Sequence, residues 1–395
     1  MAASSPLPRR RRYTVRILIG IAALLGVFAI FALFANRQLL NSDNWSDTSS
    51  AMLADPAIRT QLSNYLVDEL YNDVDVAQQV SGALPPRLQP LAGPITGGLR
   101  ELALRTTNTL LGRPRVQDLW KAANKATAEQ FINIAENKSK AISQQGNAVV
   151  LDLRVVLVQL IARLGLPSSL SDKLPPEAGK IKILTGNQVS TLQNGANALH
   201  GLAVVLPALA LGLLALAVYL AAGRRREELM IAGVTLIAIG ALVLIVRRAA
   251  GHGVVDSLVK QDSVKPAAQA AWDIGTRLLQ QAAQATVVIG IPLVLASWLA
   301  GGTRPARAFR SIAAPTMRDQ VGVTYAVVGA IVVLILAWGP IPATRMLIPV
   351  LIMIGLTIFG VEALRRQTAV EYPAVAAPAA LGNGQPTEPE KAAIT

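Results

Sequence analysis

Residues 9–36 read RRRRYTVRILIGIAALLGVFAIFALFAN, a run of arginines followed by a long apolar stretch. From Ile17 to Ala35 the chain has 19 uncharged residues, more than the apolar part of a secretory signal and close to the roughly 20 that span a bilayer as a helix. A signal peptidase cutting after Ala35 would meet Leu33 where it needs a small residue. We therefore expect a retained membrane anchor, and the arginines before it predict a cytoplasmic N-terminus.

The composition of the whole chain is typical of a polytopic membrane protein. Apolar residues make up 52% and charged residues 15% of the 395 residues, whereas soluble domains average about 25% charged. Glu362 leaves only 16 uncharged residues in the last apolar segment, which makes it the weakest span. The sequence thus predicts a mainly α, helical membrane protein with six spans, at 17–36, 199–223, 229–246, 285–302, 321–341 and 346–364.

The net charge of +13 follows this topology and does not indicate a nucleic-acid partner. Residues 37–198 hold 16 Lys and Arg against 14 Asp and Glu, so the basic excess lies beside the spans. The positive-inside rule then places four segments in the cytoplasm: 1–16, 224–228, 303–320 and the tail 365–395, whose composition predicts disorder. Arg247 and Arg248 would lie outside, and we expect their side chains to snorkel to the headgroups.

Residues 37–198 are long enough for one compact exterior domain, and most of them have helical periodicity. Segments 148–153 and 180–184 are β-prone and bounded by Gly or Pro, so we predict a two-stranded element within a mostly helical domain. No stop signal separates Gly186 from the second span, which is therefore expected to begin as a helix inside the domain. The chain has no cysteine, so this domain has no disulfide framework.

The second exterior segment, 247–284, contains an amphipathic pattern. Between residues 268 and 282, small or apolar side chains, Trp272 among them, recur three or four positions apart, with polar residues on the other side. This pattern predicts a helix leading into the fourth span. Because its apolar side needs a partner, we predict that 253–282 packs under the 37–198 domain and forms one exterior unit with it.

Candidate metal ligands are few. The only histidines, His200 and His252, are both expected near the outer membrane surface, with Asp256 one helical turn after His252. These three residues make a weak metal site, because no second pair of ligands has a recognisable spacing. Unrelated interfacial residues are the simpler interpretation, and we expect neither a metal nor a cofactor.

Four residues are singled out as interfacial or coupling positions, the first of them Trp272. Trp45 directly follows the first span and is typical of an interfacial anchor, with a ligand-binding aromatic as the alternative. Asp68 and Asp256 share a V-D-x-L core in YLVDELY and GVVDSLV, 188 residues apart, which hints at two short helices beside the membrane surface. Asp68 also belongs to an acidic cluster that is most simply a solvated helix end.

A resemblance is carried by six strings, NSDNWSDTSSAMLADPAI, YLVDELY, GNAVVLDLR, AAWDIGTRLL, SWLAGGTRPAR and GVEALRRQTAVEYP. Together they resemble a family of multispanning integral membrane proteins found mainly in high-GC Gram-positive (actinobacterial) bacteria, and the similarity runs along nearly the whole chain. The resemblance implies a plasma-membrane location and an extracytoplasmic helical domain. It supplies no catalytic residue.

Two classes of function remain after these observations. No phosphate-binding loop, hydrolase elbow or metalloprotease motif supports an enzyme. We therefore expect a non-enzymatic protein of the bacterial cell envelope whose exterior domain senses, binds or scaffolds a protein or lipid of the envelope. The alternative is a permease or lipid-handling subunit using spans two to six, because spans without charges near mid-membrane suit a hydrophobic substrate.

Overall fold

The computed structural model describes residues 9–137, 148–152, 180–221, 224–338 and 347–371. The prediction of a mainly α membrane protein is confirmed. The helices are α1 (Arg9–Leu39), α2 (Ser42–Ala54), α3 (Pro56–Asp73), α4 (Val76–Ala83), the 3₁₀ turn η1 (Gln89–Leu91), α5 (Ala92–Leu111), α6 (Pro114–Ala135), α9 (Gly186–Leu220), α10 (Arg225–Leu258), α11 (Lys265–Gly275), α12 (Arg277–Leu299), α13 (Arg304–Asp319), α14 (Val321–Trp338) and α15 (Leu347–Glu371).

Four of these helices are long and apolar enough to cross a membrane: Tyr13–Leu39 in α1, Gln188–Leu220 in α9, the whole of α10 and the whole of α12. Many of their large apolar side chains are exposed, including Ile17, Leu24 and Val204, each 60% exposed or more. Such a surface over the length of a span is stable against lipid and not against water. The chain is therefore a membrane protein.

The predicted fifth and sixth spans are not among these four helices. Of the predicted span 321–341, residues 321–338 form α14, whose apolar part among the described residues, Val321–Leu334, is shorter than a span. Of the predicted span 346–364, residues 347–364 belong to α15, which continues through the charged residues Arg365 and Arg366 after Glu362. The link between them, 339–346, lies outside the described residues. The prediction of disorder from residue 365 is wrong for 365–371, because these residues are the last turns of α15.

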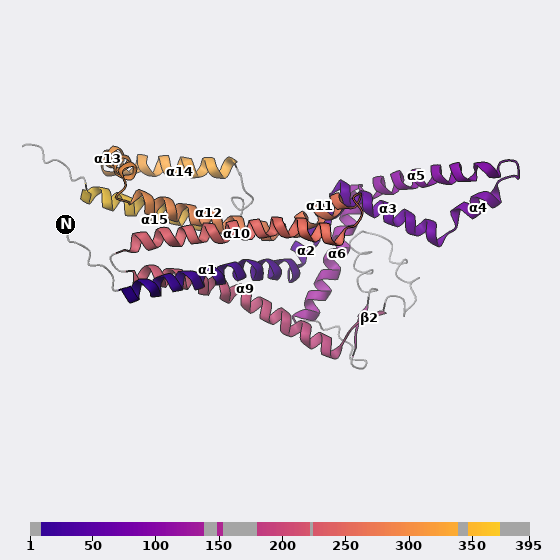
Figure 1. The fold of residues 1–395 in the computed structure, drawn as a ribbon, viewed down its shortest axis with the longest axis horizontal. Coiled ribbons are helices and arrows are strands. Elements are labelled where there is room, and N and C mark those ends of the chain that lie inside the picture. Colours follow the sequence, from indigo (N-terminus) through magenta and orange to yellow (C-terminus); the bar gives the residue numbers. More distant parts are fainter. Residues whose placement is uncertain (1–8, 138–147, 153–179, 222–223, 339–346, 372–395) are drawn as a thin grey trace, which may run out of the picture.

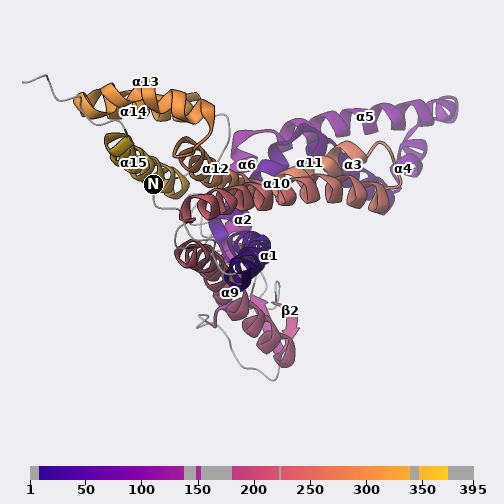
Figure 2. The ribbon, with the colours of Figure 1, turned by 60° about the vertical axis from the view of Figure 1, so that its left-hand side comes forward.

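The spanning helices run side by side along the long axis of the molecule (Figure 1). The start of α1, the end of α9, the start of α10, the end of α12 and α13 gather at one end, which we call the basic end; α2 to α6 and α11 lie at the opposite end (Figures 1 and 2). Two buried clusters join the helices. One contains Val15, Ile19, Ala22, Leu214, Ala217, Ala232 and Leu236, and the other contains Ile30, Ile239, Val243, Leu279 and Ala283.

At the end opposite the basic end, the chain forms two strands and a long helix. β1 (Ala148–Asp152) and β2 (Lys180–Thr185) pair antiparallel, with Ala148 opposite Thr185 and Asp152 opposite Lys180. β2 continues directly into α9, which runs 35 residues without interruption into the bundle. The helix of the second span therefore begins before the apolar segment, at Gly186, as the sequence predicts.

Helices α10 and α12 approach so closely that only glycine fits between them. A Cβ on Gly233 would lie 3.0 Å from the backbone nitrogen of Val294, and one on Gly290 would lie 2.8 Å from the carbonyl oxygen of Gly233. At Gly240 a Cβ would lie 2.5 Å from the carbonyl oxygen of Ala283. Small residues drive helix association in lipid, where burial of apolar surface gives little advantage. This contact therefore fixes the helix pair.

Replacing Gly240 by Ala should destabilise the protein, because the new methyl group meets backbone that can move only if the helices part. Overpacking of this kind costs roughly 1–3 kcal/mol. The matched control is Gly212→Ala on α9, where a Cβ meets nothing within 4 Å. Thermal unfolding of the detergent-solubilised protein should show a lower Tm for G240A and an unchanged or slightly higher Tm for G212A. Equal Tm values would contradict the close contact.

Candidate functional site at the junction of α10, α11 and α12

Arg247 holds the elbow between α11 and α12 against α10. Its side chain is only 12% exposed, and its Nη2 lies 3.0 Å from Asp273 Oδ1. Its Nε donates to Thr276 Oγ1 at 2.8 Å, and its Nη2 also donates to the backbone oxygen of Asp273 at 3.2 Å. Asp273 belongs to the last turn of α11, and Thr276 is the single residue between the two helices. One guanidinium therefore fixes the angle of the elbow.

The expectation that Arg247 snorkels to lipid headgroups is wrong. A carboxylate and a hydroxyl lie within reach on the neighbouring helices, and a charge-assisted hydrogen bond inside the protein is stronger than contact with mobile headgroups. Sequence reasoning missed Asp273 and Thr276 as partners. The available signal was that Arg247 and Arg248 were the one exception to the predicted charge pattern.

Trp272 packs into a space that Gly251 leaves open on α10. A Cβ on Gly251 would lie 2.6 Å from Trp272 Nε1 and 2.7 Å from Cδ1. The indole Nε1 donates to the backbone oxygen of Arg247 at 3.3 Å. Trp272, predicted as an interfacial or coupling residue, thus contacts α10 directly and supports the Arg247 elbow from the side.

Helix α11 also packs against α2 and α3, which confirms, for residues 265–275, the predicted contact of 253–282 with the 37–198 segment. Gln61 Nε2 on α3 donates to the backbone oxygen of Ser263 at 2.9 Å. The Cε of Met52 on α2 lies 3.5 Å from where a Cβ of Gly275 would be. The elbow is therefore in contact with the 37–198 segment on one side and with the bundle on the other.

Three polar contacts join helices α2 and α6. Lys121 lies 2.7 Å from Asp47, Lys125 lies 2.6 Å from Asp43, and Trp120 Nε1 donates to Ser49 Oγ at 2.7 Å. The hydrogen bond and the charge of Lys125 lower the pKa of Asp43 below its ordinary value. These contacts hold α2, on which α11 rests, in one orientation.

The other predicted coupling residues occupy separate places. Trp45 lies on α2 with its side chain 40% exposed. Asp68 on α3 pairs with Arg100 of α5 at 2.5 Å, and the carboxylate of Asp256 on α10 lies 3.8 Å from Lys265 Nζ. Each aspartate of the shared V-D-x-L core thus meets a basic residue of another helix.

The two histidines make local contacts. A ring nitrogen of His200 on α9 lies 3.3 Å from Asn36 Nδ2 on α1. His252 Nδ1 lies 2.8 Å from the carbonyl oxygen of Arg248, so this nitrogen carries the proton. His252 and Asp256 line one cavity of about 320 Å³ beside Lys265, and His200 does not line it. Among the residues that the structure describes, no group of three His, Asp or Glu side chains is arranged to hold a metal ion.

Comparison of the chain with protein-family models, with curated proteins and with solved structures found no match. The resemblance carried by the sequence strings therefore stays a prediction. The site has to be interpreted from its own contacts.

Replacing Arg247 by Gln should loosen the elbow, because Asp273 and Thr276 then lose their charged partner. The expected result is faster amide hydrogen exchange across α11 in the solubilised protein, by about tenfold if the lost charged hydrogen bonds are worth roughly 1.5 kcal/mol. The control is Arg248→Gln, which removes the same charge from an exposed neighbour. Equal exchange in both variants would show that Arg247 does not hold the elbow.

Proposed function

We propose that the protein is a non-enzymatic, six-span protein of the bacterial plasma membrane, with both termini in the cytoplasm. In this proposal α2 to α6 lie outside and bind a component of the cell envelope. Binding would then shift α11, and α11 would transmit this shift to α10 and α12. The fifth and sixth spans of this proposal are α14 and α15.

The observation that carries the proposal is the exposed apolar surface of the arm formed by α3, α4 and α5. Neither α4 nor α5 contains a buried residue. The arm extends away from the bundle in both views (Figures 1 and 2). Its exposed large side chains include Tyr65, Leu66, Leu70, Leu99 and Leu102, each between 42% and 62% exposed. An apolar surface of this kind on an arm outside the bundle is typical of a binding surface.

The internal contacts of the arm leave this apolar surface free for a partner. Arg59 Nε donates to Asn108 Oδ1 at 3.1 Å, and Asn108 Nδ2 donates to Thr60 Oγ1 at 3.1 Å. Together with the ion pair between Asp68 and Arg100, these contacts join α3 to α5. Because these contacts between α3 and α5 are made by polar side chains, apolar side chains of the arm remain exposed on its surface.

The proposed route from the arm to the bundle follows contacts already described. Helix α3 packs against α11 and also binds Ser263, just before α11, through Gln61. Helix α11 contacts α10 through Trp272 and Arg247, and glycine residues pack α10 closely against α12. A partner that changed the tilt of α3 would act on the elbow through this path.

The proposed orientation is supported by the charges at the basic end. Arginines of four helices and one link belong to this end: Arg16, Arg224, Arg225, Arg226, Arg304, Arg307, Arg310, Arg365 and Arg366. Such clustering at one end of a bundle is what the positive-inside rule describes.

The orientation can be tested with single cysteines, because the native chain has none. We expect Asn72→Cys on α3 to react with a membrane-impermeant thiol reagent on whole cells. Thr303→Cys, at the basic end, should react only after the membrane is permeabilised. Both positions are exposed, so a difference in labelling reports the side of the membrane. The reverse pattern would contradict the topology.

Binding by the arm can be tested by photo-crosslinking in living cells. A photoreactive amino acid at Leu102 should form a discrete adduct with an envelope protein or lipid, because this side chain is 61% exposed and apolar. The same probe at Gln79, an exposed polar position on α4, is the control and should form no such adduct. Adducts at neither position, or equal adducts at both, would count against a binding surface on the arm.

A further inference from the structure

A cavity of about 470 Å³ opens at the basic end of the bundle, where α12 ends and α13 begins. The start of α10 and the end of α15 complete its wall. Three of its lining side chains are arginines and one is acidic, so its lining has an excess of positive charge. The lining consists of Arg226, Ala300, Gly301, Gly302, Arg307, Arg310, Gln367 and Glu371.

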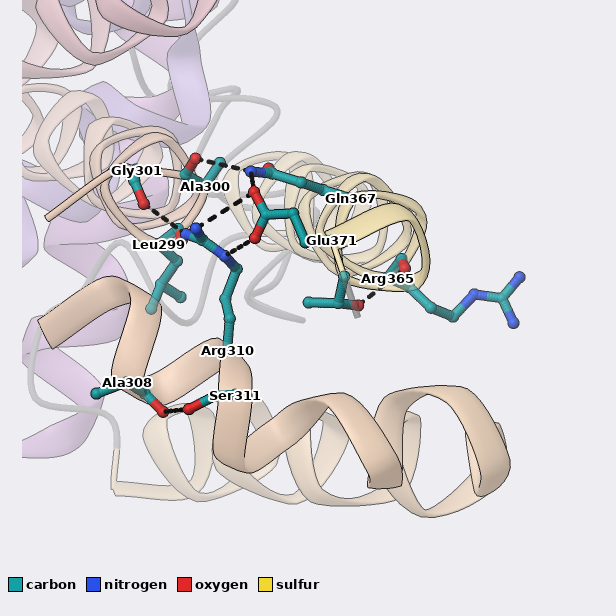
Figure 3. A network of polar contacts seen from close by, with 10 residues as sticks. Leu299, Ala300, Gly301, Ala308, Arg310, Ser311, Arg365, Gln367 and Glu371 are labelled. Atoms are coloured by element: carbon teal, nitrogen blue, oxygen red, sulfur yellow. Dashed lines mark hydrogen bonds and ion pairs between the residues drawn. The ribbon is translucent and has the colours of Figure 1, made fainter. Parts of the chain in front are cut away.

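Arg310 forms part of the wall of this cavity, and its charge is already paired inside the protein. Its side chain is 2% exposed, and its Nε lies 2.9 Å from Glu371 Oε2. Its Nη1 donates to the carbonyl oxygens of Leu299 and Gly301, the latter at 2.6 Å. Figure 3 shows the guanidinium between Glu371 and these carbonyl groups. The wall is therefore a closed network joining α13, the end of α12 and α15.

Gln367 completes the network. Its Nε2 donates to the backbone oxygen of Ala300 at 3.1 Å and to Glu371 Oε1 at 2.8 Å (Figure 3). Among the described residues that line the cavity, the only carboxylate is that of Glu371, and it is already engaged by Arg310 and Gln367. It is not available to neutralise the other two arginines.

Arg226 and Arg307 keep their charges. Arg226 Nε donates to the backbone oxygen of Ser297 at 2.8 Å, which directs the guanidinium along the cavity wall. Its Nη2 lies against Gly301, where a Cβ would be only 2.2 Å away. Within the described ranges, neither the terminal nitrogens of Arg226 nor any side-chain nitrogen of Arg307 has a protein partner. Two guanidinium groups at one cavity match the oxygens of a phosphate group.

Helix α13 brings the mouth of the cavity to the level of lipid headgroups. Figure 1 shows α13 almost end-on, whereas α12 and α14 run along the long axis, so α13 lies across the end of the spans. Ala306, Arg310, Ala314 and Met317 are buried on its protein side. Phe309 and Ile312 are 48% and 77% exposed on one flank, and Arg307 lies on the other. A helix of this kind lies in the membrane interface.

We propose that this cavity binds the phosphate of an anionic phospholipid headgroup, with Arg226 and Arg307 as its ligands and Arg310 as a positioning residue. The lipid is favoured over free phosphate because the same helix also exposes the apolar side chains of Phe309 and Ile312 on its other flank, where acyl chains can cover them. Basic pockets between membrane helices on the cytoplasmic side are typical of such headgroup sites. The site lies at the opposite end from the arm, so it does not depend on what the arm binds.

The test uses the full-length protein in neutral detergent, titrated with phosphatidylglycerol, with bound lipid counted by native mass spectrometry. Phosphatidylcholine with the same acyl chains should bind more weakly. Arg226→Gln with Arg307→Gln should weaken phosphatidylglycerol binding roughly fivefold for each arginine removed, as expected for basic residues at a lipid surface. The control, Arg113→Gln with Arg115→Gln, removes the same charge from exposed positions at the start of α6 and should leave binding unchanged.

Three results would overturn the proposal: unchanged binding in R226Q/R307Q, equal binding of the two lipids, or displacement of phosphatidylglycerol by an equal concentration of inorganic phosphate. The last would assign the cavity to the free anion. If the double variant does not fold, Arg307→Gln alone keeps the test valid, because this exposed side chain has no partner among the described residues. It should still weaken binding about fivefold, with an unchanged Tm.

Discussion

The backbone contact between α10 and α12 is the constraint on which the rest of the bundle depends. In lipid, apolar side chains gain little by leaving one apolar surface for another, so close packing of small residues has to hold the helices together. Gly233, Gly240 and Gly290 supply that packing, and their spacing leaves no room for a methyl group. The two buried clusters that involve α1 and α9 then form around a pair whose geometry is already set.

This helix pair carries an arginine bridge at each end. At one end Arg247 of α10 donates to Thr276, just before α12 begins. At the other end Arg226 of α10 donates to the backbone oxygen of Ser297, close to where α12 ends. Both bridges run from α10 to α12, so the distance between them is set by the length of one helix. The elbow and the basic cavity are thus two ends of a single rigid element.

Much of the helical architecture can be predicted from the sequence, because the spacing of apolar residues and the positions of charges are local properties of the chain. The first span, the unbroken α9 and the amphipathic α11 are all visible as runs of residues. The partners of Arg247 could not be predicted in this way. Asp273 and Thr276 lie more than 20 residues further along the chain, and only the packing of α12 against α10 places them next to Arg247. Likewise Gly212 and Gly240 look alike in the sequence, and only Gly240 faces another backbone.

The basic cavity could not be predicted from the sequence, for a related reason. The sequence places residues 365–395 in a disordered tail, but α15 extends to Glu371, which meets the buried Arg310 of α13. A buried arginine is costly unless its charge and its donors are satisfied, and here the carboxylate and two carbonyl groups do so. Glu371, the acidic residue among the described residues of the cavity lining, is therefore occupied by Arg310. The same ion pair that secures α15 to the bundle therefore leaves Arg226 and Arg307 as unneutralised cations at its open side.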